Sequence, residues 1–372
     1  MEFKLRLATA LLASSSGLAM AQSSVTVYGL LDATVGRFKG AATGVNSLDR
    51  SVTAVNGGGL STSHLGLRGT EDLGGGYSAI FDISTFIRND TGAVGRSDAV
   101  GPPVNVAADP FWSRFSWVGI ASRDWGRIRA GNITTLLFVN SITSNAFGDS
   151  TVFGPLNLVT HIGGPQAGGT GWTNQVVYDS PGLGGLRFSL ARSLSEGRGG
   201  GNSSARVSYE QGPLAASLAW QSVKQNPLTF ADGTTPNNVK TWVLGGSYDF
   251  TAVKVFAHVG RIQNDGTEAA PQDVGYRLME VSASVPVGAG RILAGYALRK
   301  TRDTPAPVPA TAAGGNVERA VLTLGYDHHL SKRTDLYAIV MSDRTETRTL
   351  PAPPSIVKAS GTSYGFGIRH RF

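Results

Sequence analysis

The feature that most constrains this chain is a polarity that alternates residue by residue, in segments of about ten residues, from Val25 to the C-terminus. In 25–35, for example, the odd positions are apolar or glycine and most even positions are polar, and the alternation recurs at 186–190 and 214–221. A period of two residues predicts β-strands with one apolar and one polar face. No segment after the N-terminal one is long and apolar enough to span a membrane as a helix. If the chain enters a membrane, it must do so as a closed barrel, which satisfies its own backbone hydrogen bonds.

Clusters of Gly, Pro, Asn and Asp divide the alternating segments into sixteen predicted strands. Short connections such as 122–124, 181–183 and 287–288 alternate with long ones such as 38–59 and 225–237. Outer-membrane barrels have this asymmetry, with tight periplasmic turns and long external loops. The sequence therefore predicts an all-β fold, a transmembrane antiparallel β-barrel of sixteen strands. The predicted strands are 25–37, 60–71, 76–89, 112–121, 125–132, 174–180, 184–193, 204–211, 213–224, 238–250, 252–264, 274–286, 289–302, 316–329, 333–345 and 362–372.

The N-terminus has the form of a secretory signal peptide. Two basic residues precede an apolar stretch at 7–18, and Ala19 and Ala21 place small residues where a signal peptidase reads them. We expect 1–21 to be removed and the mature chain, 22–372, to form the barrel of an exported protein in the cell outer membrane. An uncleaved membrane anchor is the alternative, but the apolar stretch is shorter than the roughly 20 residues that a spanning helix needs.

Composition excludes several other classes of protein. The 372 residues include 49 Gly, no Cys and 16% charged side chains, which fits many tight turns and rules out disulfides, cysteine chemistry and thiolate metal sites. The formal net charge of +7 is modest, and the basic residues are spread at strand-like intervals. Nucleic-acid binding proteins instead gather basic residues on one stripe or helix, so we expect no nucleic-acid partner.

One connection, 133–173, follows the fifth predicted strand and is much longer than the others. It is rich in Gly, Asn, Ser and Thr and contains two apolar pieces, 136–139 and 152–153. A connection of this length is usually either functional or disordered. The apolar pieces favour a segment that folds inward and rests against the inner wall of the barrel.

Six short motifs, in a fixed order and spacing, carry a resemblance to a known family. They are QSSVTVYGLLD at 22–32, LGLRGTEDLGGG at 65–76, VYDSP at 177–181, GYD at 325–327, LSKRTDLY at 330–337 and GIRHRF at 367–372. Together they resemble the trimeric general porins of β-proteobacteria over nearly the whole mature chain. The resemblance implies a sixteen-stranded barrel, a homotrimer, and a third external loop that folds into the pore as a constriction. It also implies passive diffusion of small hydrophilic solutes and ions through a water-filled channel.

The resemblance further implies basic side chains on one wall of the pore that face acidic groups on the third loop. Arg68 and Arg114 match the family's arginines at this place. His64 and Asn132 stand where the family usually has arginine, and Ser84 stands where it has glutamate. We therefore expect a weaker field across the constriction than in relatives.

Four more residues complete the predicted constriction. Arg127 and Arg129 lie on the polar face of their predicted strand and are the candidates to supply the missing positive charge. Asp149 is the only acidic residue of 133–173, and Asp82 lies on the polar face of its own strand. Cations in a narrow aqueous passage raise the local concentration of anions, so we expect a weak anion preference. The alternative is that these residues simply make the wall polar, with Asp82 paired to an arginine.

The C-terminal Phe372 shares the apolar face of the last predicted strand with Tyr364, Phe366 and Ile368. A terminal aromatic residue on such a strand resembles the signal that the barrel-assembly machinery of the outer membrane reads. The alternative is a residue of the aromatic girdle at the surface of the lipid.

The sequence gives no support for catalysis or metal binding. It contains no phosphate-binding loop, zinc-binding helix motif or Ser nucleophile elbow. His328 and His329 are adjacent on a predicted strand, so they point to opposite faces and cannot hold one metal ion. We expect no enzyme activity, metal or cofactor. The remaining alternative to a channel is a structural or adhesive barrel with little conductance.

Overall fold

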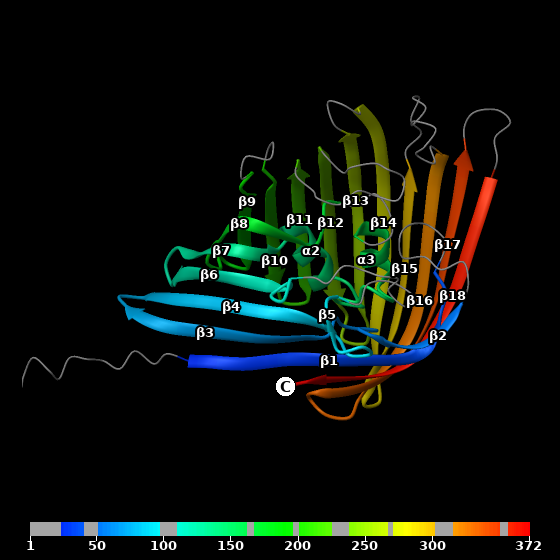
Figure 1. Ribbon diagram of the computed structural model, residues 1–372, viewed down its shortest axis with the longest axis horizontal. Helices are drawn as coiled ribbons and strands as arrows, with labels where there is room; N and C mark the ends of the chain where they lie inside the picture. Colours follow the sequence, from blue (N-terminus) through cyan, green and yellow to red (C-terminus); the bar gives the residue numbers. More distant parts are fainter. Residues whose placement is uncertain are drawn as a thin grey trace, which may run out of the picture.

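Antiparallel strands form one sheet that closes on itself as a barrel (Figure 1). The first strand, β1 (Ser24–Phe38), pairs with the last, β18 (Ile356–Arg371), and this pairing closes the wall. The computed structural model describes residues 24–40, 51–96, 110–161, 167–195, 201–224, 238–266, 271–301, 315–349 and 356–372. The predicted signal peptide, 1–21, lies outside the described residues.

Counted over the described residues, the wall has sixteen strands, which confirms the predicted number. Two further strands are accessory. Strand β2 (Val52–Gly57) continues the line of β3 (His64–Gly74), since both pair with β1, and β5 (Ala93–Val94) extends one end of β4. The other strands of the wall are β4 (Tyr77–Arg88), β6 (Phe115–Ser122), β7 (Gly126–Thr134), β8 (Gly171–Asp179), β9 (Leu186–Ser193), β10 (Ser203–Gln211), β11 (Leu214–Val223), β12 (Val239–Asp249), β13 (Lys254–Gly266), β14 (Pro271–Val287), β15 (Gly290–Thr301), β16 (Gly315–His329) and β17 (Thr334–Thr349).

The second strand of the wall is interrupted, which was not predicted. Its second part begins at His64 instead of at 60, and its first part, β2, lies in a stretch predicted as a connection. Between the two parts, residues 58–63 leave the sheet. The buried carboxylate of Asp32 on β1 accepts hydrogen bonds from two backbone N–H groups of this excursion, at 2.9 and 2.8 Å. Gly58 starts the excursion with a φ of +83°, which glycine adopts at little cost.

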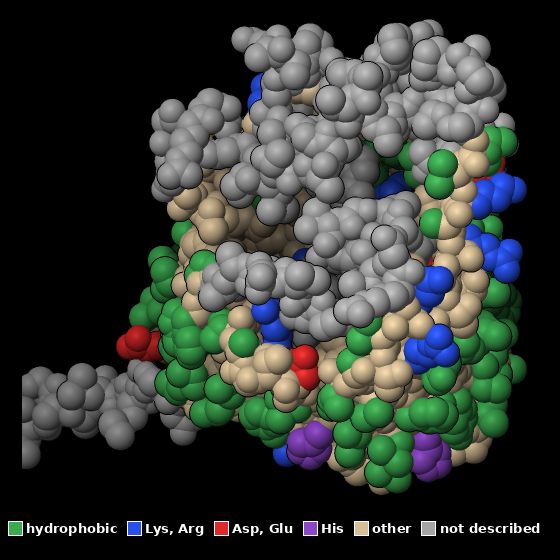
Figure 2. Space-filling model, turned by 45° about the vertical axis from the view of Figure 1, so that its right-hand side comes forward, with side chains coloured by type: hydrophobic (Ala, Val, Ile, Leu, Met, Phe, Trp, Pro, Cys, Tyr) green, Lys and Arg blue, Asp and Glu red, His purple; other side chains and the backbone are tan. Residues whose placement is uncertain are grey.

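Apolar side chains cover much of the outer face of the wall (Figure 2). On β16, Leu322 and Leu324 are 45% and 48% exposed, whereas Val321 and Thr323 on the other face are fully buried. The alternation read from the sequence therefore separates an outer from an inner face. So much exposed apolar surface is suited to contact with lipid hydrocarbon. None of the described helices is long and apolar enough to cross a membrane.

Strands at the end of the long connections extend further than the sequence predicted. Strands β17 and β18 remain paired as far as Arg348 and Ile356, beyond the predicted limits of 333–345 and 362–372. In these end segments of β17 and β18, the residues no longer alternate clearly between polar and apolar, although the backbone pairing of the two strands continues. Polarity patterns detect the part of a strand with two different surroundings, and this is why the ends were missed.

Candidate functional site

The connection between β7 and β8 contains two short helices, α2 (Leu136–Thr143) and α3 (Pro155–Thr160). The backbone N–H of Phe138 donates to the side-chain oxygen of Thr135 at 3.3 Å, so Thr135 caps α2. A proline in the first turn of α3 suits a helix start, since its missing N–H has no partner there in any case. The apolar pieces 136–139 and 152–153 lie in α2 and directly before α3.

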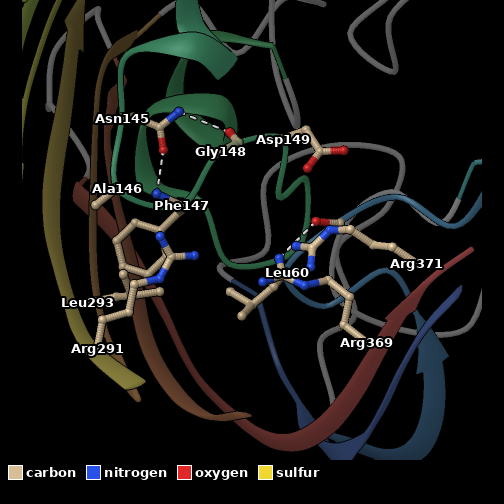
Figure 3. Close-up of a pocket in the computed structure, with 11 residues that line it drawn as sticks. Leu60, Asn145, Ala146, Phe147, Gly148, Asp149, Arg291, Leu293, Arg369 and Arg371 are labelled. Carbon is tan, nitrogen blue, oxygen red and sulfur yellow. Dashed lines mark hydrogen bonds between the residues drawn. The ribbon is translucent and has the colours of Figure 1, made fainter. Parts of the chain in front are cut away.

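The turn between the two helices carries Asp149 to the edge of a recess of about 240 Å³ (Figure 3). Its carboxylate accepts hydrogen bonds from the backbone N–H of Thr62, at 3.3 Å, and from the Thr62 hydroxyl, at 3.0 Å. Across the recess lie Arg291 of β15 and Arg369 and Arg371 of β18. Asp149 was predicted as a site residue, whereas these three arginines were not.

Two buried carboxylates hold the three arginines in place. Arg369 donates to Asp327 at 3.0 Å and to Asp335 at 3.0 Å, Arg291 donates to Asp327 at 2.9 Å, and Arg371 donates to Asp335 at 2.9 Å. Arg369 is almost completely enclosed, but the side chains of Arg291 and Arg371 remain 37% and 42% exposed. The strand parity of Arg369 and Arg371, opposite Ile368 and Phe372, was a signal in the sequence that would have placed them inside.

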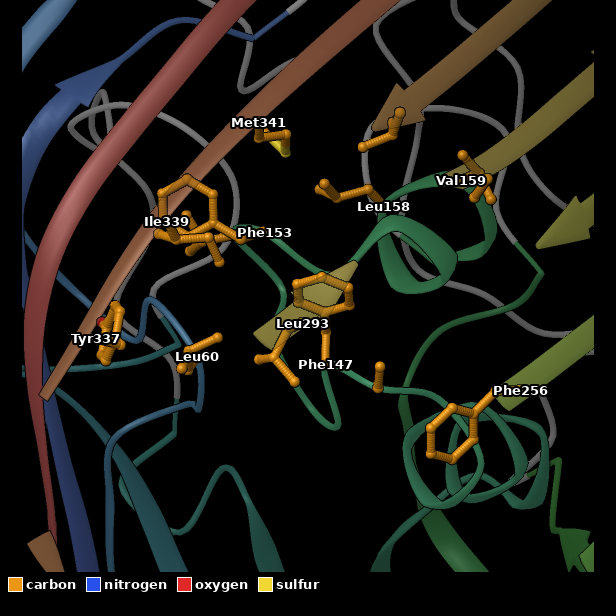
Figure 4. Packing of buried hydrophobic residues seen from close by; sticks show 14 of the residues in the cluster. Leu60, Phe147, Phe153, Leu158, Val159, Phe256, Leu293, Tyr337, Ile339 and Met341 are labelled. Atoms are coloured by element: carbon orange, nitrogen blue, oxygen red, sulfur yellow. The ribbon is translucent and has the colours of Figure 1, made fainter. Parts of the chain in front are cut away.

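The segment that contains α2 and α3 packs against the inner face of the barrel wall (Figure 4). Phe147, Phe153 and Leu158 of the segment form a buried cluster with wall residues such as Leu293 of β15 and Met341 of β17. Burial of side chains of this size stabilises the packed arrangement by about 2 kcal/mol each. The wall residues in this cluster alternate with the exposed outer ones, so the segment contacts the face opposite to the apolar outer face.

Hydrogen bonds from wall side chains also fix the segment. Arg299 and Arg319 donate to backbone carbonyls of α3, each at 2.9 Å, and the Thr323 hydroxyl donates to the carbonyl of Phe153 at 2.9 Å. Arg319 also forms a buried ion pair with Asp343 at 2.9 Å. Bonds of this kind from a charged donor are stronger than neutral ones.

One anchor has the atom order of a catalytic triad. The imidazole of His258 lies 2.8 Å from the Ser144 hydroxyl through Nε2 and 2.7 Å from the Glu280 carboxylate through Nδ1. All three side chains are buried, and the ring of His258 fills the space over Gly245, where an added Cβ would lie 2.3 Å from it. The Ser144 hydroxyl is also 2.6 Å from the carbonyl of Asn140. The chain of hydrogen bonds therefore ties the end of α2 to β13 and β14, with no open space over the hydroxyl for a substrate.

Three predicted site residues gather around Tyr28 of β1. Its hydroxyl donates to the Asp82 carboxylate at 2.6 Å, and the Arg68 guanidinium lies over its ring at 5.2 Å. The ring of His64 packs edge-on against Tyr28 at a centroid distance of 6.0 Å. Asp82 is thus held by a phenol instead of an arginine. Tyr28 was missed, although it occupies the polar face of its predicted strand.

Arg114 lies directly before β6, with its guanidinium 4.3 Å from the ring centre of Phe115. Its backbone N–H donates to the carbonyl of Ser84 at 3.1 Å. Within the described residues, the buried Ser84 hydroxyl has no hydrogen-bond partner. Burial lowers the pKa of Arg114, and the acidic groups of Tyr28, Asp149 and Asp82 act in the opposite direction. This places Arg114 within electrostatic range of Asp149.

Arg127 and Arg129 share one acidic partner, Asp179 of β8, each at 2.8 Å. Their charge is therefore partly neutralised, and the guanidinium of Arg129 also lies 5.1 Å from the ring centre of Trp117. Asp179 was predicted to lie in the strand 174–180 but not as the partner of these arginines, which are 52 and 50 residues away in the chain. Asn132 donates to the backbone carbonyls that precede β6, at 3.1 and 3.3 Å, which holds the start of that strand.

Asp327, His329 and Asp335 place three possible metal ligands within 4.8 Å of one another. Both carboxylates already accept hydrogen bonds from arginines, and His329 Nδ1 lies 2.7 Å from Asp335. We assign the group as an ion-pair network, because guanidinium groups occupy the carboxylates that a cation would need. His328 lies beside Tyr326, which shares its face of β16.

Phe372 continues the pairing of the last strand with the first. Its backbone N–H and carbonyl exchange two hydrogen bonds with Gly29, each at 3.1 Å. The ring lies where a side chain at position 29 would be, with an added Cβ only 2.4 Å from it, and is 45% exposed. Gly29 therefore makes room for the terminal aromatic residue on the outer face.

Comparisons with known proteins agree on one family. A model of the Gram-negative porin family matches residues 8–348. Outer membrane porin protein 32 of Delftia acidovorans is 31% identical over 380 residues, covering 96% of this chain and 97% of its own. An outer membrane porin protein of Bordetella pertussis is 28% identical, covering 99% and 100%. Among solved structures, the anion-selective porin from Comamonas acidovorans superposes with a TM-score of 0.72 at 25% identity, covering 94% and 100%, and OmpT of Vibrio cholerae in its trimer form with 0.64 at 15% identity, covering 94% and 99%.

Proposed function

Because the chain belongs to the Gram-negative porin family and is therefore an outer-membrane channel protein, we propose that it passes small hydrophilic solutes and ions by diffusion, with a weak preference for anions. The observation that carries this proposal is a closed wall with apolar side chains outside and arginine, aspartate and tyrosine side chains inside. The anion selectivity named for the structural relative from Comamonas supports the sign of the preference. A structural or adhesive barrel with little conductance is not favoured.

The segment 133–173 is the proposed constriction of this channel. Its contacts with the inner side of β13 to β17 support this role, since they bring Asp149 across the barrel to Thr62, beside β3. The opposite side of the passage is then formed by the group around Tyr28. In this arrangement, Arg68 and Asp82 are paired across β3 and β4 on the same wall as Arg114, and Asp149 is the acidic group that the segment brings towards them.

The charges at the proposed constriction favour only a weak selectivity for anions over cations. Arg68 and Arg114 form no ion pair among the described residues, whereas Arg127 and Arg129 share Asp179. Asp82 and Asp149 carry charge of the opposite sign to Arg68 and Arg114. Arg291 and Arg371, in the recess beside Asp149, add positive charge that Asp327 and Asp335 partly neutralise. A small excess of positive charge at the constriction changes the ratio of anions to cations in the passage by only a few-fold.

Three further assignments belong to the same proposal. Residues 1–21 are the cleaved signal peptide, and Phe372 is the signal that the barrel-assembly machinery reads. The mature chain assembles as a homotrimer in outer-membrane lipid, as in the trimer form of the OmpT structure. No catalytic role is proposed, since the one triad-like chain of hydrogen bonds found among the described residues is enclosed.

Planar-bilayer recording of the refolded protein tests the proposed function. We expect stepwise, ohmic conductance and a reversal potential in a salt gradient that indicates a mild anion preference. An intact oligomer that inserts but conducts no current would favour the structural or adhesive barrel. A cation-preferring channel would contradict the assigned charges while leaving the channel function in place.

A further inference from the structure

A row of residues on the outer face combines tryptophan with positive charge. The strand register places Trp220 of β11 opposite Trp242 of β12, Trp242 opposite Arg261 of β13, Arg261 opposite Arg277 of β14, and Arg277 opposite Lys300 of β15. We call these five residues the rim row. All five share the strand face of the exposed apolar residues, and both tryptophans are about 40% exposed, at 42% and 40%.

The next row down the same strands is entirely apolar. It consists of residues that are again directly opposite one another in the register: Leu218, Leu244, Val259, Met279 and Leu298. The rim row lies on the side of the long connections, so it faces the external surface. Tryptophan and basic residues directly above a band of aliphatic residues mark the level of the lipid head groups. Figure 2 shows such an order on one side of the barrel, with Lys and Arg side chains on the wall above a belt of hydrophobic ones.

Three lysines near this level have an acidic partner. Lys300 binds Glu318 at 2.8 Å, Lys358 binds Glu346 at 3.4 Å, and Lys240 binds Asp265 at 3.1 Å. The two arginines at the centre of the rim row differ in this respect.

Among the described residues, neither Arg261 nor Arg277 forms an ion pair. Arg261 donates to the side-chain oxygen of Gln263 at 3.1 Å, and Arg277 is exposed. Like charges directly opposite each other on neighbouring strands repel and destabilise the sheet. The pair therefore costs stability unless an anion lies between the two guanidinium groups.

We propose that Arg261 and Arg277 bind the phosphate of an anionic lipid in the outer leaflet. Two guanidinium groups offer planar pairs of donors that match phosphate oxygens. A lipid fits better than a free anion because its acyl chains would lie along Val259 and Met279 directly below, with the ring of Trp242 beside the head group. The site lies on the outer face and is separate from the passage through the barrel.

Native mass spectrometry of the purified oligomer tests this site. The probes are detergent micelles that contain phosphatidic acid or, at the same mole fraction, phosphatidylcholine, whose phosphate is masked by choline. We expect phosphatidic acid to remain bound to the wild-type oligomer in preference to phosphatidylcholine. The variant R261Q/R277Q should bind phosphatidic acid roughly tenfold more weakly or worse, since it loses charge-assisted hydrogen bonds. The variant R261K/R277K, which keeps the charge but not the paired donors, should lie in between.

The matched control is K240Q/K358Q, which removes two positive charges from the same level of the barrel where each already has an acidic partner. It should bind phosphatidic acid as the wild type does. Equal loss in both double variants would overturn the proposal in favour of general charge attraction. Displacement of the lipid by millimolar inorganic phosphate would overturn the lipid as occupant. Loss of the oligomer, or altered single-channel conductance, in R261Q/R277Q would assign the row to a subunit contact or to the channel instead.

Discussion

Replacing Arg68 and Arg114 together by alanine tests whether these two side chains set the field in the channel. Arg68 stacks on Tyr28, Arg114 lies against Phe115, and neither forms an ion pair among the described residues. Only the backbone of Arg114 takes part in the pairing with Ser84, so the substitution leaves that hydrogen bond intact. We therefore expect the variant to fold and to lose two positive charges from the passage.

The size of the effect follows from distance and screening. An anion that passes about 5 Å from a guanidinium gains about 0.8 kcal/mol in water before screening. A Debye length of about 10 Å at 0.1 M salt reduces this to about 0.5 kcal/mol per charge. Two charges then change the local anion concentration about fivefold, with an opposite change for cations. At 1 M salt, where the Debye length is about 3 Å, the same calculation gives less than a twofold change.

The assay is the zero-current potential across a planar bilayer in a salt gradient, recorded at low and at high salt. We expect the variant to shift towards cation preference, and the shift to shrink as salt rises. The control is K240Q/K358Q, which removes the same charge from the outer face and should leave the potential unchanged. A zero-current potential that does not move in R68A/R114A, or moves equally in the control, would refute the assignment of these arginines to the constriction.

Three other outcomes test the segment between β7 and β8. Replacing residues 145–154 by a short glycine linker should raise single-channel conductance, and unchanged conductance of an intact oligomer would mean that the segment does not narrow the passage. Gly245→Val should lower the temperature at which the oligomer dissociates in gel electrophoresis, because an added Cβ would lie 2.3 Å from the ring of His258. Gly182→Val serves as the comparison, since an added Cβ there would meet only the Arg187 side chain, at 3.7 Å. Equal shifts in the two variants would contradict this reasoning. Burial lowers the pKa of His161 to about 3, so its contribution to stability is complete above pH 6.5 and falls by about 1.4 kcal/mol per pH unit below that. The segment should therefore become more sensitive to protease as the pH falls from 6.5 towards 4, and H161Q should remove that dependence; the same pH profile in H161Q would exclude His161 as its source.

The sequence predicted the wall well because a period of two residues is visible wherever a strand has lipid on one side and polar surroundings on the other. On β9, Leu186 and Leu190 mark the strand to within two residues of its observed start. The alternation of polarity is lost where a strand no longer has lipid on one side and polar surroundings on the other. Strand β2 was missed because Gly57 and its neighbours read as a turn, and the upper ends of β17 and β18 lack a lipid-facing side.

The site was predicted less completely, because its contacts join residues that are far apart in the chain. Asp149 and Arg68 could be picked out by loop composition and strand parity. The partner of Arg127 is 52 residues away, and Ser144 meets His258 across 114 residues. No local spacing rule relates such positions. Tertiary packing decides which charged side chains remain unpaired, and the unpaired charges set the electric field in the channel.

The pairing of Phe372 with Gly29 has a consequence for the order of folding. The backbone hydrogen bonds that seal the wall join residues separated by almost the entire length of the polypeptide. Closing so large a loop is entropically costly, and contacts of this kind form late and slowly. Until the last strand arrives, β1 has an edge with unpaired backbone groups, which is open to pairing with other chains. We infer that the chain remains prone to aggregation throughout its passage to the membrane, and that this ends only when its final residue is in place.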